Sequence, residues 1–124
     1  MSYTIEISES GKFFRIRVEG EVSVELANEW SMELMELSSV RGIQRYLFDT
    51  RTARNVSSMV QNYNFAYHDS HELQLSRSAR SVILACQEDD SHNFVVTTMR
   101  NAGFNVKLFT DESSAVAWLE EEVG

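Results

Sequence analysis

The order of hydrophobic patterns along the chain is the feature that most constrains its fold. Two runs with a period of two come first, Tyr3–Glu9 and Phe14–Glu19, and Gly11-Lys12 forms a turn between them, which predicts a β-hairpin. Three helix-then-strand alternations follow, and the chain ends on a helical pattern. Strands that alternate with helices favour a parallel sheet. We therefore expect an α/β fold of order ββαβαβαβα, a mixed, mostly parallel five-stranded sheet with four helices, as a single domain over residues 1–124.

Local signals give each expected element its bounds. Ser23 is the predicted N-cap of the first helix, Asp89-Asp90-Ser91 offer caps for the third, Gly103 fits its end, and Thr110 or Asp111 caps the last. The expected helices are 23–38, 56–75, 89–102 and 110–122, and the expected later strands are 45–49, 80–86 and 104–109. Thr50–Asn55 is predicted to be a polar loop, and helix 56–75 is predicted to be irregular near Asn62–Asn64.

Composition excludes several classes of protein. The 124 residues carry a net charge of -8 and 43% apolar residues, which argues against disorder and against nucleic acid as a partner. One cysteine excludes a disulfide framework, and Cys86 is expected to be a small core residue at the end of a strand. No signal peptide or membrane-spanning run is evident, so we expect a cytoplasmic protein.

The charge is unevenly distributed. Residues 50–86 hold four arginines, Arg51, Arg54, Arg77 and Arg80, against two carboxylates. The segment starts at the carboxyl end of a predicted parallel strand, where open α/β sheets usually bind ligands. One interpretation is a site for an anion or an acidic partner. The other is that these are solvated arginines that balance nearby carboxylates.

The second helix is rich in aromatic side chains. Met59, Tyr63, Phe65 and Tyr67 could line an apolar pocket or form a lid over it, or they could simply be core.

No catalytic centre is evident. His68 and His71 could share a helical face, but a metal site needs a third ligand. Ser57 or Ser58 could pair with His68, but the strained G-x-S-x-G turn is absent. We expect no metal, no cofactor and no enzymatic activity.

Three short segments carry a resemblance to a known family. They are Tyr46-Leu-Phe-Asp49 followed by Arg51, the strand Val106–Phe109, and the helix Ser114-Ala-Val-Ala-Trp-Leu119. With the order of elements, these segments resemble the SpoIIAA-like proteins. The resemblance implies a fold shared with STAS domains, the anti-sigma factor antagonists, and with CRAL-TRIO lipid carriers. It also implies an apolar cavity under mobile helices, membrane association and no enzymatic activity.

The STAS antagonists are phosphorylated on a serine at the start of the helix after the third strand, within a pattern like Asp-Ser-Ser-Gly-Leu. This chain reads Asn55-Val-Ser-Ser-Met-Val60 there, so Ser57 and Ser58 fill the serine positions, while the Asp and the Gly are absent.

Two functional hypotheses result. The first is a non-enzymatic module that binds a lipid or other amphiphilic anionic ligand under the second helix, with peripheral membrane contact. Its predicted ligand-binding residues are Arg51, Arg54, Met59, Tyr63, Phe65, Tyr67 and Arg77. The alternative is a protein–protein regulatory switch of the anti-sigma factor antagonist kind, controlled by phosphate on Ser57 or Ser58. A homodimer is expected on general grounds.

Overall fold

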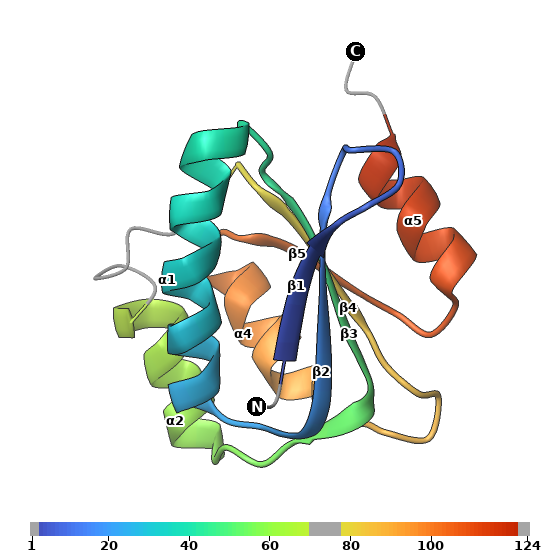
Figure 1. Cartoon of the computed structure of the whole chain (residues 1–124). Helices are drawn as coiled ribbons and strands as arrows, with labels where there is room; N and C mark the ends of the chain where they lie inside the picture. Colours follow the sequence, from blue (N-terminus) through green and yellow to red (C-terminus); the bar gives the residue numbers. More distant parts are fainter. Residues whose placement is uncertain (1–2, 70–77, 122–124) are drawn as a thin grey trace.

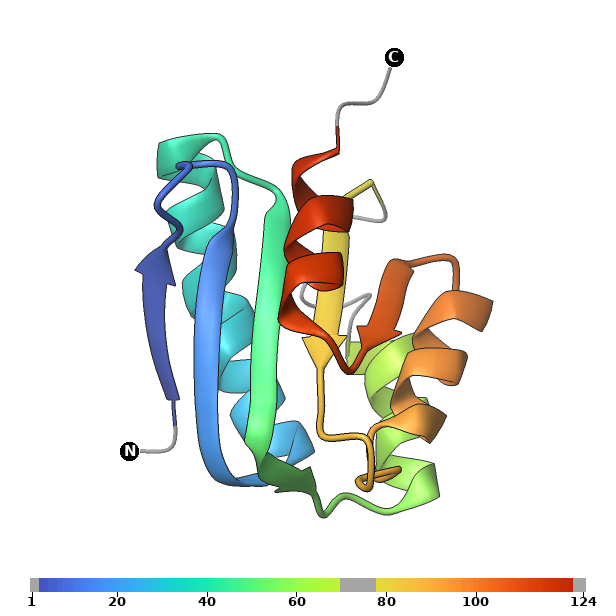
Figure 2. The ribbon, with the colours of Figure 1, turned by 90° about the vertical axis from the view of Figure 1, so that its right-hand side faces the viewer.

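A computed structural model describes residues 3–69 and 78–121 of the chain. Its elements are, in order, β1 (Tyr3–Ile7), β2 (Phe14–Val22), α1 (Val24–Arg41), β3 (Arg45–Asn55), α2 (Met59–Asn64), the π-helical turn η1 (Phe65–Asp69), β4 (Arg80–Leu84), α4 (Asn93–Asn101), β5 (Asn105–Phe109) and α5 (Glu112–Glu120). The strands form one sheet in the order β1-β2-β3-β4-β5. Helices α1, α2 and α4 lie on one side of the sheet and α5 on the other (Figures 1 and 2).

The predicted hairpin and the mixed sheet are confirmed. Strand β1 pairs antiparallel with β2, and β2, β3, β4 and β5 pair in parallel. Phe14, Ile16 and Val18 of β2 are at most 1% exposed and form the core under α1, as the period-two pattern predicts.

The predicted loop at Thr50–Asn55 is wrong, because these residues extend β3. After a register shift between Arg17 and Glu19, Thr52–Asn55 pair with Glu19–Val22 of β2. The segment is polar because Arg51, Thr52 and Arg54 face solvent, while Ala53 and Thr50 point inward and are buried. The backbone pairing that holds the segment does not depend on an apolar pattern.

The helix ends follow the predicted capping residues in three of four cases. The Ser23 hydroxyl accepts from the Leu26 N–H at 3.2 Å, and the Asp111 carboxylate accepts from the Ser114 N–H at 2.9 Å. Gly103 follows α4 with φ near +100°, a conformation that glycine adopts readily. The start of α4 differs from the prediction, since the helix begins after His92 with no side-chain cap.

The second helix begins three residues later than in the predicted 56–75. It runs over Met59–Asn64 and continues as η1 over Phe65–Asp69, so its regular part ends at the predicted irregularity. The remainder of that predicted helix lies outside the described residues. The Ser58 hydroxyl accepts from the Gln61 N–H, and the Gln61 side chain accepts from the Ser58 N–H. This reciprocal pair forms a capping box that fixes where α2 begins.

The two faces of the sheet are packed differently. On the α5 face, Leu47, Val82 and Leu84 are fully buried against Ala115 and Leu119. On the face under α1 and α4, the neighbouring side chains of the same strands are only half-buried: Tyr46, Phe48, Ser81 and Ile83. Because these residues lie in central strands, their exposure requires an open space between the sheet and the helices above it.

The expectation for Cys86 is wrong. Strand β4 ends at Leu84, two residues before it, and the side chain of Cys86 is exposed. Its thiol donates to the Arg51 carbonyl oxygen at 3.1 Å.

Candidate functional site

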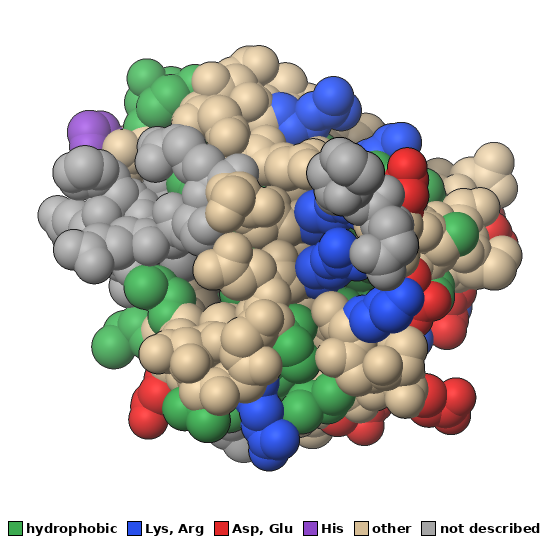
Figure 3. All heavy atoms as spheres, turned by 90° about the horizontal axis from the view of Figure 1, so that it is seen from above, with side chains coloured by type: hydrophobic (Ala, Val, Ile, Leu, Met, Phe, Trp, Pro, Cys, Tyr) green, Lys and Arg blue, Asp and Glu red, His purple; other side chains and the backbone are tan. Residues whose placement is uncertain are grey.

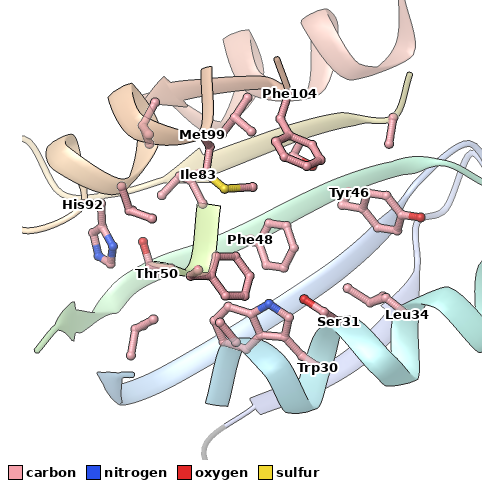
Figure 4. Close-up of a pocket in the computed structure, with 18 of the residues that line it drawn as sticks. Trp30, Ser31, Leu34, Tyr46, Phe48, Thr50, Ile83, His92, Met99 and Phe104 are labelled. Atoms are coloured by element: carbon pink, nitrogen blue, oxygen red, sulfur yellow. The ribbon is translucent and has the colours of Figure 1, made fainter. Parts of the chain in front are cut away.

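An apolar cavity of about 350 Å³ lies between the sheet and the helices. Tyr46, Phe48 and Ile83 form its floor, and Trp30 and Leu34 of α1 form one wall. Met99 and Phe104 close the opposite side, as Figure 4 shows. This volume falls at the lower end of the range for small-molecule sites, which are also mostly apolar.

Polar residues also line the cavity, and several of them already have partners in the protein. The Thr50 hydroxyl donates to the Leu84 carbonyl oxygen at 2.9 Å, and the hydroxyls of Ser38 and Tyr46 bond to each other. Burial raises the pKa of Tyr46 above its usual value. Buried His92 has its Nε2 3.2 Å from the carbonyl oxygen of Ala53. A ligand in this cavity would therefore be held mainly by apolar contact.

Only one of the predicted ligand-binding residues that the structure describes lines this cavity. Phe65 is 7% exposed and contributes to the wall. Met59, Tyr63 and Tyr67 are not in the wall; their side chains are exposed on the outer side of the helix. Arg77 lies outside the described residues. A role for these residues in binding a ligand stays a prediction.

The exposed side chains form an apolar surface along the start of α2 and η1. Val56, Met59, Val60, Tyr63 and Tyr67 are each between 39% and 69% exposed, and we call them the α2 patch. The rings of Tyr63 and Tyr67 pack against each other with their centroids 4.6 Å apart. Five large apolar side chains within twelve residues exceed the scattered exposure that is normal on protein surfaces.

Ser57 and Ser58 lie at the start of α2, next to this patch. Ser58 is exposed and caps α2, as described above. Ser57 is half-buried, and its hydroxyl accepts from the Val24 N–H at 2.8 Å. The Ser57 side chain therefore connects the beginnings of α1 and α2.

The basic centre expected from the sequence is divided in the structure. Arg51 bonds both carboxylate oxygens of Asp49, at 2.9 and 2.7 Å, and also contacts Glu112 at 2.9 Å. Arg54 contacts Asp89 at 3.4 Å. Arg80 is at the other end of the sheet, at the start of β4. Arg51 and Arg54, at the carboxyl end of β3, therefore balance nearby carboxylates, which was the second of the two interpretations.

These ion pairs alter the ionisation of the groups in them. Burial alone would raise the pKa of Asp49, but hydrogen bonds and charge from Arg51 lower the pKa below its usual value. Hydrogen bonding to Asp49 raises the pKa of Arg51 in turn. Asp49 and Glu112 thereby fix Arg51 against the first turn of α5.

No cluster of three His, Cys, Asp or Glu side chains is arranged to hold a metal ion within residues 3–69 and 78–121. His68 is exposed on η1, and His71 is not among the described residues. His92, which the sequence treats as remote, is the histidine at the cavity. The helical spacing predicts Trp30 and Leu34 as core residues of α1. In the structure they line the cavity because an open space separates α1 from the sheet.

Comparison with known proteins identifies the fold. No family model and no curated protein matches the sequence. Among solved structures, an uncharacterized protein from the DUF3478 family of Shewanella loihica PV-4, described as having a SpoIIAA-like fold, is 19% identical. It matches with a TM-score of 0.59 over 95% of this chain and 92% of its own. The anti-sigma factor antagonist SpoIIAA in its unphosphorylated form is 12% identical and matches with a TM-score of 0.60 over 98% of this chain and 100% of its own.

This chain has a SpoIIAA-like fold. The resemblance in the sequence therefore predicted the fold correctly, and the identities are low enough that the likeness concerns the fold alone. The SpoIIAA-like fold of the described residues includes no helix long and apolar enough to cross a membrane.

Proposed function

We propose that the protein is a non-enzymatic regulatory module that binds a protein partner through the α2 patch. The observation that carries the proposal is the concentration of exposed Val56, Met59, Val60, Tyr63 and Tyr67 on one short segment. Aromatic residues and methionine are enriched in protein interfaces. The SpoIIAA-like fold supports a regulator of the anti-sigma factor antagonist kind, the alternative hypothesis from the sequence.

The same proposal includes control by phosphate at the start of α2. Ser58 is the better placed acceptor because its side chain is exposed, whereas Ser57 is half-buried. A phosphate would add nearly two negative charges beside Met59 and Val60. Burial of that charge with the apolar patch would be unfavourable, so phosphorylation would weaken partner binding.

Quantitative pull-downs from a lysate of the native host test the proposal. A Val60→Ser, Tyr63→Ser double variant should lose a partner that the unmodified protein retains. The matched control is Met32→Ser, Val40→Ser, since Met32 and Val40 are similarly exposed side chains on α1. The control should retain the same partner, and Ser58→Asp should reduce its recovery.

If the Val60→Ser, Tyr63→Ser variant recovers every partner at the level of the control, the α2 patch is not the interface. If Ser58→Asp has no effect on a partner that the patch variant loses, the interface stands and control by phosphate does not.

A second function is supported by the cavity. We propose that it holds a lipid or another small amphiphile, because half-buried Phe48 and Ile83 leave apolar surface open beneath α1 and α4. Native mass spectrometry of protein purified from its host should then show a mass above that of the apoprotein, and organic extraction should release it. Ser31→Leu would place a branched apolar side chain in the cavity and should reduce occupancy, while Ser113→Leu on exposed α5 surface should not.

Peripheral membrane contact is the remaining part of that proposal. Co-sedimentation with anionic vesicles should decline in the Val60→Ser, Tyr63→Ser variant if the α2 patch inserts into the interface. Unchanged or absent sedimentation would contradict it.

A further inference from the structure

A second, polar pocket lies at the amino end of the parallel strands, far from the carboxyl end where the sequence suggested an anion site. Its volume is about 350 Å³, and it is lined by Gly42, Gln44, Arg45, Ser78 and Arg80. Figure 3 looks onto this end of the molecule, where Lys and Arg side chains gather across its middle. A protein of net charge -8 thus has a positive surface here.

Arg45 and Arg80 are neighbours in the sheet. They are the first residues of β3 and β4 and occupy the same register position of the parallel pair. Like charges on directly adjacent strand positions are destabilising. The fold therefore places two arginines on adjacent strand positions, and the partial negative charge of the carbonyl oxygens at the end of α5 offsets only part of their charge.

The partners of the two guanidinium groups are neutral. Arg45 Nη1 donates to the Leu119 carbonyl oxygen at 2.7 Å, and Arg80 Nη1 donates to the carbonyl oxygens of Trp118 and Glu121 at 2.9 and 3.0 Å. Among residues 3–69 and 78–121, neither has a carboxylate within 4.0 Å. In contrast, Arg51 and Arg54 at the other end of the sheet both have carboxylate partners.

The arrangement leaves hydrogen-bond donors for a ligand. A guanidinium has five N–H donors in a planar fork that matches phosphate oxygens, and the described bonds of each arginine use Nη1 alone. The Gln44 side-chain oxygen accepts from the Ser78 hydroxyl at 3.3 Å, which leaves the amide NH₂ of Gln44 as a further donor.

A third cation lies near the same aromatic ring as Arg80. The Arg80 guanidinium is 5.5 Å from the centroid of the Trp118 ring, and Lys107 Nζ is 5.9 Å from it. Aromatic faces stabilise cations without neutralising them, so the Trp118 ring does not cancel the charge of Arg80 or Lys107.

We infer that this pocket binds a phosphate group, with Arg45 and Arg80 as its charged ligands and Gln44 as an additional donor. A doubly charged phosphate matches two guanidinium groups in charge and geometry better than a carboxylate does. This inference is independent of the proposed partner interface, since α2 contributes no residue to this pocket.

A titration of the full chain with inorganic phosphate, followed by amide NMR at constant ionic strength against chloride, tests the inference. The expected result is a saturable shift of the Gly42, Gln44 and Ser78 amide signals. Arg45→Gln and Arg80→Gln should each weaken binding at least tenfold, and Gln44→Ala a few-fold. The matched control, Arg54→Gln, removes an exposed arginine elsewhere and should leave binding unchanged.

Arg45→Gln and Arg80→Gln also remove bonds to the end of α5, so circular dichroism must confirm that each variant folds. If they do not fold, the unmodified protein and Gln44→Ala still decide the question. Shifts that do not saturate, that chloride reproduces, or that avoid these three amides overturn the inference.

A binding experiment with phosphatidic acid vesicles identifies the source of the phosphate group. Binding to phosphatidic acid vesicles that free phosphate reverses would assign a lipid headgroup. No vesicle binding alongside saturable phosphate binding would assign a soluble phosphate compound. Vesicle binding without any binding of free phosphate would overturn the inference, because it would reflect surface charge and not this pocket.

Discussion

Two adjacent residues of β4 provide a direct test of the unequal packing of the sheet. Leu84 is fully buried against α5, while Ile83 faces the cavity and is half-buried. Both side chains lose three carbon atoms when replaced by alanine, so the chemical change is matched. We predict that Leu84→Ala destabilises the protein much more than Ile83→Ala.

The magnitudes follow from burial. Removing three buried carbon groups costs about 2.4 kcal/mol at ~0.8 kcal/mol each, and the new cavity that Leu84→Ala leaves raises this to about 4 kcal/mol. For Ile83 part of the surface already faces an open space, and its removal enlarges an existing cavity. We expect about 1–2 kcal/mol for Ile83→Ala.

Urea unfolding measures the difference. Trp30 lies on the cavity side and Trp118 on the α5 side, so the fluorescence reports on both sides of the sheet. A fluorescence transition that coincides with the one followed by circular dichroism would support a two-state analysis. Equal free-energy losses for the two variants, or a larger loss for Ile83→Ala, would refute the claim that the sheet is loosely covered under α1 and α4. A changed m-value in either variant would require a separate account of its unfolded state.

Three further predictions concern ionisation and helix capping. Burial and the hydrogen bond to Glu33 raise the pKa of Tyr3 to about 12. Glu33→Gln should lower the pKa of Tyr3, as measured by ultraviolet titration. An unchanged pKa would contradict the role of Glu33. Because the pKa of Tyr3 is raised on folding, its contribution to stability is present below its unfolded pKa near 10 and disappears as pH rises through about 12. The pKa of Asp49 is lowered on folding, so the contribution of Asp49 to stability is present above the unfolded pKa near 3.9 and disappears as pH falls through the folded pKa. Arg51→Met should therefore move the midpoint of acid unfolding, followed by circular dichroism, to higher pH. An unchanged midpoint would contradict the role of Arg51. Ser23→Ala should cost about 1 kcal/mol in urea unfolding by removing the N-cap of α1, whereas exposed Ser39→Ala should cost little.

The sequence predicted those parts of the fold that local chemistry determines. The alternation of Phe14, Ile16 and Val18 defines one face of β2, and the side chains of Ser23 and Asp111 cap their own helices. Each of these signals acts within a few residues, so it can be recognised without knowledge of the partners.

The extension of β3 through Thr50–Asn55 could not be predicted in that way. It depends on pairing with Glu19–Val22, which lie more than thirty residues earlier in the chain and follow a register shift. The polar side chains of this segment resemble those of a loop.

The candidate site was only partly predictable for a related reason. Aromatic side chains on the second helix indicated a pocket, but Met59, Tyr63 and Tyr67 are exposed and Phe65 alone among the described residues of that set reaches the cavity. A cavity is a defect in packing between elements, and no pattern within one element records it. The adjacency of Arg45 and Arg80 likewise depends on strand register.

The sequential order of the strands determines where the apolar cavity of this protein lies. Doubly wound sheets bind ligands at a topological switch point, where the strand order reverses and successive helices pass to opposite faces. Here β2 to β5 follow one another without reversal, and the helices that the structure describes between them lie on one face. The sheet therefore has no such crevice, and its apolar cavity lies between two layers of the core. Substitutions in the loops at the sheet edge would leave the shape of that cavity unchanged. Substitution of Trp30, Phe48 or Ile83, which line the cavity, would alter its shape directly.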